Sequence, residues 1–209
     1  MALIPRLFGI TPGDDGHPRD VQSLAEAAAS GGMDALILRE PARTERELVT
    51  LARVLSPCVG PGLILHASHA SAASIAEASG WGLHLPSHAD PSLIRTRIQG
   101  LMGISCHNSA QLHAAAAAGC DYAFISPIFT PHSKPDDSRT TIGIDGLALL
   151  TKQCPIPVIA LGGITPNRAR QCVAAGAHGV AAMGIVFGPT FTPEDVRTTA
   201  QELYAAVHQ

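Results

Sequence analysis

Two glycine-bearing segments near the C-terminal end are the part of the sequence best suited to bind an anion. Segments 156–165 and 179–185 each have the character of a short buried strand that stops at glycine. A glycine at a strand end lets a ligand approach the backbone closely and leaves N–H groups that point at it. Glycine also serves close packing alone. We predict a phosphate site made by the backbone N–H groups of Gly162, Gly163, Met183 and Gly184.

Histidine supplies the groups best suited to proton transfer, because its side chain titrates near neutral pH. The chain has ten His, and we rank three as candidate catalytic bases, in the order His66, His107 and His132. The first two follow predicted strands, and the third lies in a long polar loop. A scattered His is more commonly a surface residue or a satisfied core residue. His84, which falls inside a predicted strand, is expected in the core.

Two cations and one hydroxyl complete the candidate substrate-binding set. Arg39 ends a predicted strand, Lys134 lies in the loop 127–143, and Ser105 precedes His107 by two residues. Arg39 and Lys134 would hold anionic groups, and Ser105 would orient a ring. The alternatives are a plain Arg39–Glu40 ion pair and a solvated lysine. Loops as long as 127–143 are usually functional lids or disordered.

A regular alternation of strand-like and helical patterns positions these residues. Strands are expected at 7–11, 35–39, 62–66, 82–85, 101–106 and 122–126 and in the two glycine-bearing segments. Helices are expected at 21–30, 44–55, 71–79, 91–99, around 114–118, and at 145–153, 167–175 and 193–207, with Asn167 and Thr192 as caps.

Strict alternation of this kind favours parallel strands joined by crossover helices. A doubly wound sheet would carry its glycine-rich phosphate turn after the first strand, and residues 11–16 do not have that pattern. We therefore predict a single (β/α)8 TIM barrel over residues 1–209. Its active residues should gather where the strands end, so the candidates above should meet on one face.

Composition excludes several classes of function. The apolar fraction is 46%, the charged fraction is 15% and the net charge is −3, so no basic surface indicates a nucleic-acid partner. The five Cys have no CxxC spacing and are expected to be reduced. No signal peptide is visible and no apolar stretch approaches the ~20 residues of a membrane span. We expect a cytoplasmic protein with a small-molecule substrate, and leave a homo-oligomer open.

In order and spacing, several motifs match a known family along nearly the whole chain. The matching residues are Leu38-Arg39-Glu40, Gly82 to Leu85, Ser105-Cys106-His107, Asp121-Tyr122, Ser126 to Phe129, Lys134, Ala160 to Ile164 and Gly176 to Ala181. On these residues the chain resembles the thiamine-phosphate synthase / TenI superfamily. The resemblance implies a thiazole phosphate as substrate.

The superfamily has two branches with different chemistry. The synthase joins a pyrimidine diphosphate to a thiazole phosphate with Mg²⁺, and the TenI-type tautomerase moves a proton on a thiazole phosphate carboxylate without metal. The synthase places Asn-Asp after the third strand and Asp after the fourth, where this chain has His66-Ala67 and Ala89. Mg²⁺ needs oxygen ligands, normally including carboxylates. Unless Asp90 substitutes, no metal site and no cofactor are expected, with Mg²⁺ required only for a synthase.

The resemblance therefore favours a TenI-like, metal-independent thiazole tautomerase of thiamine biosynthesis. One departure opposes it, because Pro127 stands where the TenI-type enzyme has its catalytic His. The first alternative is a divergent thiamine-phosphate synthase, a transferase. The second is a catalytically inactive binding or regulatory barrel.

Overall fold

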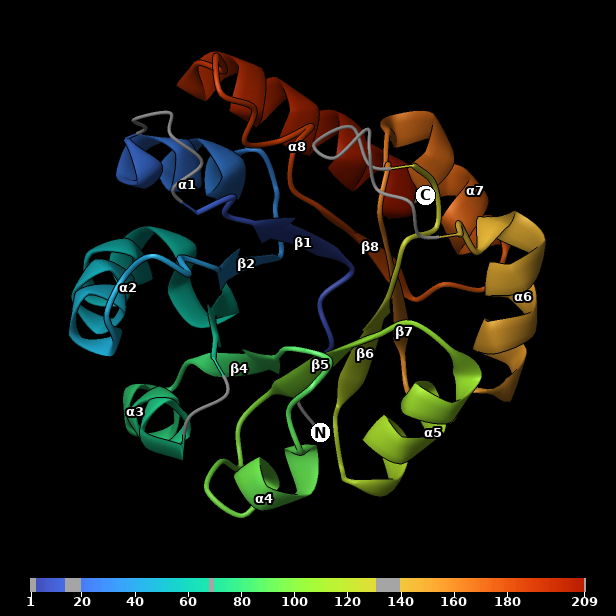
Figure 1. Ribbon diagram of the computed structural model, residues 1–209. Helices are drawn as coiled ribbons and strands as arrows, with labels where there is room; N and C mark the ends of the chain where they lie inside the picture. Colours follow the sequence, from blue (N-terminus) through green and yellow to red (C-terminus); the bar gives the residue numbers. More distant parts are fainter. Residues whose placement is uncertain (1–2, 14–19, 68–69, 131–139, 209) are drawn as a thin grey trace.

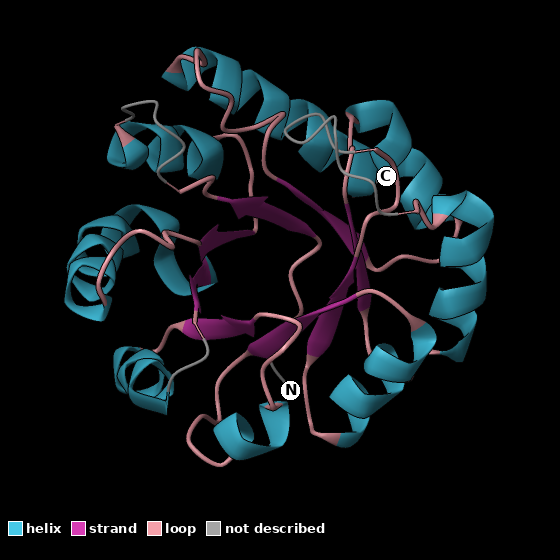
Figure 2. Cartoon of the chain, viewed as in Figure 1, coloured by secondary structure: helices cyan, strands magenta, loops and turns pink. Residues whose placement is uncertain are grey.

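Eight parallel strands close into a barrel in the computed structural model, which describes residues 3–13, 20–67, 70–130 and 140–208 (Figures 1 and 2). The strands are β1 (Leu7–Ile10), β2 (Ala35–Leu38), β3 (Leu63–His66), β4 (Gly82–Leu85), β5 (Met102–Cys106), β6 (Tyr122–Ile125), β7 (Val158–Leu161) and β8 (Gly179–Ala182). Each strand pairs with the next, and β8 pairs with β1 through Gly9 and Ala182. The predicted single TIM barrel is confirmed.

A helix follows each strand, and the helices form a ring around the barrel (Figure 1). They are α1 (Val21–Ser30), α2 (Glu45–Val59), α3 (Ala70–Ser79), α4 (Pro91–Arg95), α5 (Ser109–Ala117), α6 (Gly143–Gln153), α7 (Pro166–Ala174) and α8 (Pro193–Val207), with a short 3-10 turn at Gly60–Gly62. Helix α1 packs between α2 and α8, which helps to close the ring.

Most helix boundaries agree with the sequence patterns, and three differ. Helix α5 begins at Ser109, ahead of the predicted run around 114–118. Helix α2 continues to Val59, and α4 stops at Arg95 instead of near Gln99. Thr192 caps α8 as predicted, since its side chain accepts from the Asp195 N–H. The predicted Asn167 cap is wrong, because Thr165 caps α7 and accepts from the N–H of Arg168.

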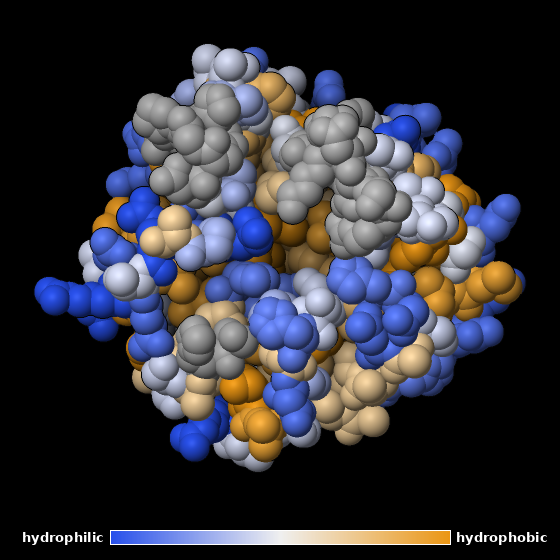
Figure 3. All heavy atoms as spheres, viewed as in Figure 1, coloured by the Kyte–Doolittle hydropathy of each residue, from blue (hydrophilic) through white to orange (hydrophobic). Residues whose placement is uncertain are grey.

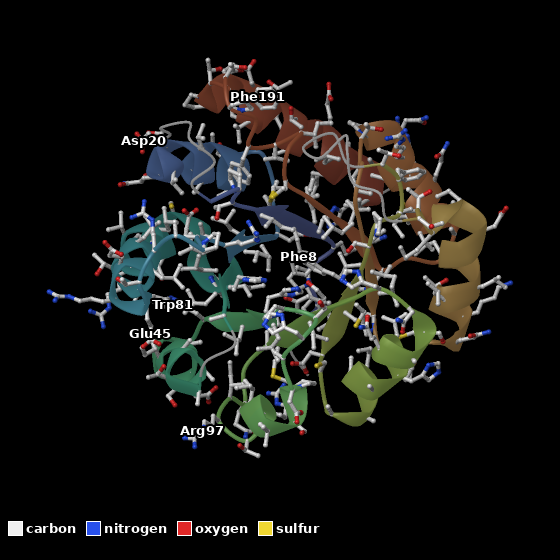
Figure 4. The ribbon with its side chains drawn as sticks, viewed as in Figure 1. Phe8, Asp20, Glu45, Trp81, Arg97 and Phe191 are labelled. Atoms are coloured by element: carbon white, nitrogen blue, oxygen red, sulfur yellow. The ribbon has the colours of Figure 1, made fainter. Side chains whose placement is uncertain are left out.

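Two apolar layers hold the barrel, one inside it and one between the strands and the helices. Inside, Phe8 lies at the centre of the barrel (Figure 4), where its ring meets Phe124 edge-on at a centroid distance of 5.1 Å. The strands contribute alternate residues to the two layers, as period-2 side chains require. The interior is therefore a filled core, and a ligand site belongs at the barrel's end.

The described cysteines are free thiols, with Cys106, Cys120 and Cys172 buried. Burial raises the pKa of each of these three thiols to about 12, so they pack as small apolar groups. Among the described residues, no helix is both long and apolar enough to cross a membrane.

Candidate active site

The ends of the strands share one face of the molecule, and that face is hollowed at its centre (Figure 3). Hydrophilic and hydrophobic residues both border the hollow (Figure 3). Parallel strands place all their C-terminal ends on this side, so the residues that follow them converge here. We call this face the mouth of the barrel.

The turn after β7 has a backbone conformation that favours glycine. Gly162 and Gly163 have φ angles of 104° and 62°, which favour glycine over other residues. The carbonyl of Gly162 accepts from the N–H of Phe129 at 3.1 Å. Because N–H and C=O point in opposite directions across a trans peptide, the Gly163 N–H points away from Phe129.

Close packing also requires these glycines. A Cβ atom on Gly162 would lie 3.0 Å from Cα of Pro127, and one on Gly163 would lie 2.5 Å from the carbonyl oxygen of Thr130. The loop that leaves β6 therefore runs directly over the turn. The packing role is thus observed for both glycines, Gly163 being buried and Gly162 half-buried, and the phosphate role of their N–H groups stays a prediction.

Arg168, on α7, also holds this turn. Its Nη1 donates to the carbonyl oxygen of Gly163 at 2.7 Å, and its guanidinium lies 4.6 Å from the centroid of the Phe129 ring. One side chain thus fixes both the glycine turn and the start of the loop after β6. The sequence interpretation did not include Arg168.

The turn after β8 has a related arrangement. The carbonyl of Met183 accepts from the N–H groups of Val186 at 3.0 Å and Phe187 at 2.8 Å. The N–H of Gly184 belongs to the same peptide, so it points away from this turn. Strands β7 and β8 are neighbours, which places the turns that contain Gly163 and Gly184 side by side.

Arg39 follows β2 and is held by the end of β1. The backbone N–H of Arg39 donates to Thr11 Oγ1 at 2.9 Å, and this hydroxyl donates to the Arg39 carbonyl at 3.1 Å. Nη1 of Arg39 donates to the Pro12 carbonyl at 3.3 Å. Glu40 forms its ion pair with Arg43, at 3.6 Å, and among the described contacts none joins it to Arg39.

His66 ends β3 and is partly buried at the mouth. Desolvation by burial, together with the nearby Arg39 charge, lowers the pKa of His66 to about 4. The imidazole is therefore neutral at pH 7 and only weakly basic. His66 ranks first among the candidate bases in the sequence. Its low pKa makes it a poorer general base than that rank implies.

His84 lies inside the barrel, as predicted, and links two neighbouring strands. Its Nδ1 is 3.1 Å from the Tyr122 hydroxyl, and its Nε2 is 3.0 Å from Ser105 Oγ. The His66 ring stacks on it at a centroid distance of 5.9 Å. The sequence interpretation placed His84 in the core but did not connect it with Ser105. The sequence feature that could have indicated this link is that His84, Ser105 and Tyr122 lie on three consecutive strands.

His107 follows β5 and is exposed, and its ring is held in one tautomer. Nδ1 lies 2.8 Å from the carbonyl oxygen of Ser126, which accepts only, so Nδ1 carries the proton. In the neutral ring Nε2 is then the basic nitrogen. The backbone N–H of His107 donates to Gln111 Oε1 at 2.7 Å, which fixes the residue further. Geometry places His107 above His66 as a candidate base.

The positions that carry carboxylates in the synthase pattern do not form a metal site here. Ala67 and Ala89 stand at those positions, and the Asp90 carboxylate caps α4 by accepting from the N–H of Ser92 at 2.9 Å. Among the described residues, no group of three His, Cys, Asp or Glu is arranged to hold a metal ion. The candidates His132 and Lys134 lie outside the described residues.

Comparisons with known proteins agree on one family. The family model TMP-TENI, described as "Thiamine monophosphate synthase", matches residues 7–186. A putative thiamine-phosphate synthase of Geobacter sulfurreducens is 34% identical over 206 residues, which are 95% of this chain and 92% of the relative. A thiamine-phosphate synthase of Chloroflexus aurantiacus is 31% identical over 207 residues, with 97% and 92% covered. Among solved structures, the thiamine phosphate pyrophosphorylase of Pyrococcus furiosus has a TM-score of 0.79 and 25% identity, with 97% and 95% covered.

Proposed function

Because the chain belongs to the thiamine monophosphate synthase family, we propose that it binds a thiazole phosphate at the mouth of its barrel and acts as a divergent thiamine-phosphate synthase. The observation that carries the proposal is the pair of glycine turns after β7 and β8. In these turns the carbonyls of Gly162 and Met183 accept backbone hydrogen bonds, so the N–H groups of Gly163 and Gly184 point in the opposite direction. Adjacent N–H groups at such turns suit a phosphate.

In the synthase reaction the main task of this site is to stabilise the leaving diphosphate. The thiazole nitrogen attacks the methylene carbon of the pyrimidine diphosphate, a C–N bond forms, and the C–O bond to the diphosphate breaks. Negative charge grows on the departing oxygen. We assign this charge to Arg39 and the Ser105 hydroxyl, because both lie at the mouth, and propose that Lys134 joins them.

The metal that the family implies does not fit the described residues. Mg²⁺ is normally bound by one or two carboxylates together with substrate phosphates. Ala67 and Ala89 offer no oxygen ligand, and Asp90 is engaged in capping α4. The proposed synthase therefore depends on its own cations and hydrogen-bond donors.

A second function, thiazole tautomerase, is supported by the same missing carboxylates and by His107. Proton transfer on a thiazole phosphate carboxylate needs one base and no metal. His107 has its Nδ1 proton committed to Ser126, so Nε2 is ready to accept a proton. Arg39 would hold the substrate carboxylate, and the glycine turns its phosphate.

One assay series separates the two activities. The purified protein is incubated with thiazole phosphate and pyrimidine diphosphate, with and without Mg²⁺, and thiamine phosphate is measured. In parallel, the thiazole phosphate carboxylate is incubated in D₂O, and proton exchange at carbon is followed by NMR. Formation of thiamine phosphate supports the synthase, and exchange without it supports the tautomerase.

Two variants sharpen the result. In a tautomerase, His107→Gln should lower turnover by roughly 10²–10⁴-fold, as expected for a lost general base, with little change in KM. In a synthase the same change should cost far less, because the reaction needs no base at this point. His113→Gln, an exposed His on α5, is the matched control. A protein that binds thiazole phosphate but shows neither activity is the inactive binder, which contradicts both proposed enzymes.

A further inference from the structure

We propose that His84 is a positioning residue that fixes the direction of the Ser105 hydroxyl, so that Ser105 donates its proton to an acceptor oxygen of the ligand. The chain of hydrogen bonds runs from Tyr122 through His84 to Ser105. The identity of the ligand rests on the proposed function. The direction of the hydrogen bonds from Tyr122 to Ser105 is independent of it.

The strand register builds this chain. Gly103 pairs with His84 on one side and with Tyr122 on the other, so β5 passes between the two large side chains. A Cβ atom on Gly103 would overlap the Tyr122 ring, and the glycine therefore makes room for the His84–Tyr122 contact. Ser105, two residues further along β5, points to the same face of the sheet and is nearer to the mouth.

Burial decides which nitrogen of His84 carries the proton. His84 and Tyr122 are 1% and 0% exposed, and apolar rings such as Phe8 and Phe124 surround the Tyr122 ring. His84 Nδ1 is the hydrogen-bond partner of the Tyr122 hydroxyl among the described residues. A buried donor left without an acceptor is costly, so the Tyr122 O–H donates to Nδ1.

The remaining steps follow from the chemistry of a neutral imidazole. Burial lowers the pKa of His84 and raises that of Tyr122, so both groups stay neutral over the physiological range. A neutral ring whose Nδ1 accepts must carry its proton on Nε2. Nε2–H then donates to Ser105 Oγ at 3.0 Å.

This arrangement directs the Ser105 proton to an acceptor atom of the ligand. Its oxygen is engaged as an acceptor by His84, so its own proton is directed to another group. Ser105 is only partly buried, at the end of β5 that faces the mouth. A phosphate, diphosphate or carboxylate oxygen satisfies this donor, and an amino group of the ligand does not.

The tautomer is measured directly on the full-length protein labelled with ¹⁵N-histidine. Long-range ¹H–¹⁵N NMR distinguishes a protonated Nε2 from a protonated Nδ1, and His84→Gln identifies the His84 signals. We expect the proton on Nε2, and in Tyr122→Phe a loss of this single tautomer. A proton on Nδ1 in the unmodified protein would overturn the proposal, whether or not the protein binds a thiazole.

The consequence for binding is tested with inorganic pyrophosphate by calorimetry. Ser105→Ala should weaken its affinity by about 10- to 100-fold, the usual effect of a lost hydrogen bond to a charged group. Ser105→Thr, which keeps the hydroxyl, should restore most of the affinity. Tyr122→Phe should weaken affinity by about 3- to 10-fold, and Tyr204→Phe, an exposed tyrosine on α8, should leave it unchanged.

A double variant shows whether Tyr122 acts through Ser105. If it does, Tyr122→Phe should have no further effect once Ser105 is Ala, because the hydroxyl that it orients is gone. An equal loss in both backgrounds would show a general structural effect and overturn the positioning role. Absence of pyrophosphate binding in the unmodified, folded protein would contradict Ser105 as a donor to anionic ligands and leave the measured tautomer unaffected.

Discussion

At the scale of single residues, the sequence identified which side chains reach the mouth better than it identified their chemistry. Arg39 and His107 directly follow β2 and β5, and Ser105 is the second-to-last residue of β5. The His66 pKa of about 4 was not predictable, because it arises from burial and from Arg39, which belongs to another strand. The His84–Tyr122 contact depends on the register of three strands, which no local pattern specifies.

The lowered pKa of His66 predicts a pH-dependent loss of stability. In the unfolded chain His66 binds a proton near its ordinary pKa of 6.5, and in the folded chain only near about 4. The unfolded state therefore binds more protons between these values, so stability falls as pH drops from 6.5 to 4. The full effect amounts to roughly 3 kcal/mol, since each pKa unit corresponds to about 1.4 kcal/mol.

The measurement is urea unfolding at pH 7 and at pH 4.5 for the unmodified protein and for His66→Gln. The variant should lose less stability between the two pH values, while His113→Gln should behave like the unmodified protein. An equal pH dependence in His66→Gln would show that this imidazole does not titrate abnormally.

At the scale of elements, local signals predicted where strands and helices occur, and tertiary contacts decided where some of them end. Helix α4 stops at Arg95, whose guanidinium donates to the carbonyls of Ile98 and Gly100 and pairs with Asp121 at 2.9 Å. These partners lie beyond the helix or on the approach to β6. The apolar pattern that continues toward Gln99 gave no sign of them.

The turn after β7 should be unusually sensitive to any side chain at Gly163. Its φ of 62° costs a non-glycine residue about 1–2 kcal/mol. Contact with the Thr130 carbonyl should raise the loss for Gly163→Ala to about 2–4 kcal/mol of unfolding free energy. Gly80→Ala is the matched control, since Gly80 has a φ of 69° and open space around it. Equal losses would show that the loop after β6 does not press on this turn.

Arg168 should affect phosphate affinity indirectly, by holding the turn after β7, without contacting the ligand. Removing it frees the Gly163 peptide and the Phe129 ring, so the N–H groups of the turn lose their fixed direction. Arg168→Ala should weaken phosphate binding about 3- to 10-fold in calorimetry, and Arg168→Lys should restore little, because a lysine lacks the planar fork. Arg170→Ala, an exposed position on the same helix, should bind as before. Full affinity in Arg168→Ala would exclude this role.

At the scale of the whole molecule, the fold was predictable because several independent sequence signals indicate the same architecture. Eight alternating units, glycine at the ends of the last two strands and caps such as Thr192 all specify one barrel. The reaction was less predictable, because the same barrel supports transfer and proton movement with few changes at the mouth. Ala67 and Ala89 stand where the resemblance leads us to expect carboxylates, so we propose that function depends on the cations and donors described above.

The most direct test of the account is a crystal structure of the protein with thiazole phosphate. We predict the phosphate at the mouth, with its oxygens within hydrogen-bond distance of the Gly163 and Gly184 backbone nitrogens and the thiazole ring on the side of Ser105 and Arg39. A phosphate bound elsewhere on the barrel, with these two N–H groups directed at other partners, would contradict it.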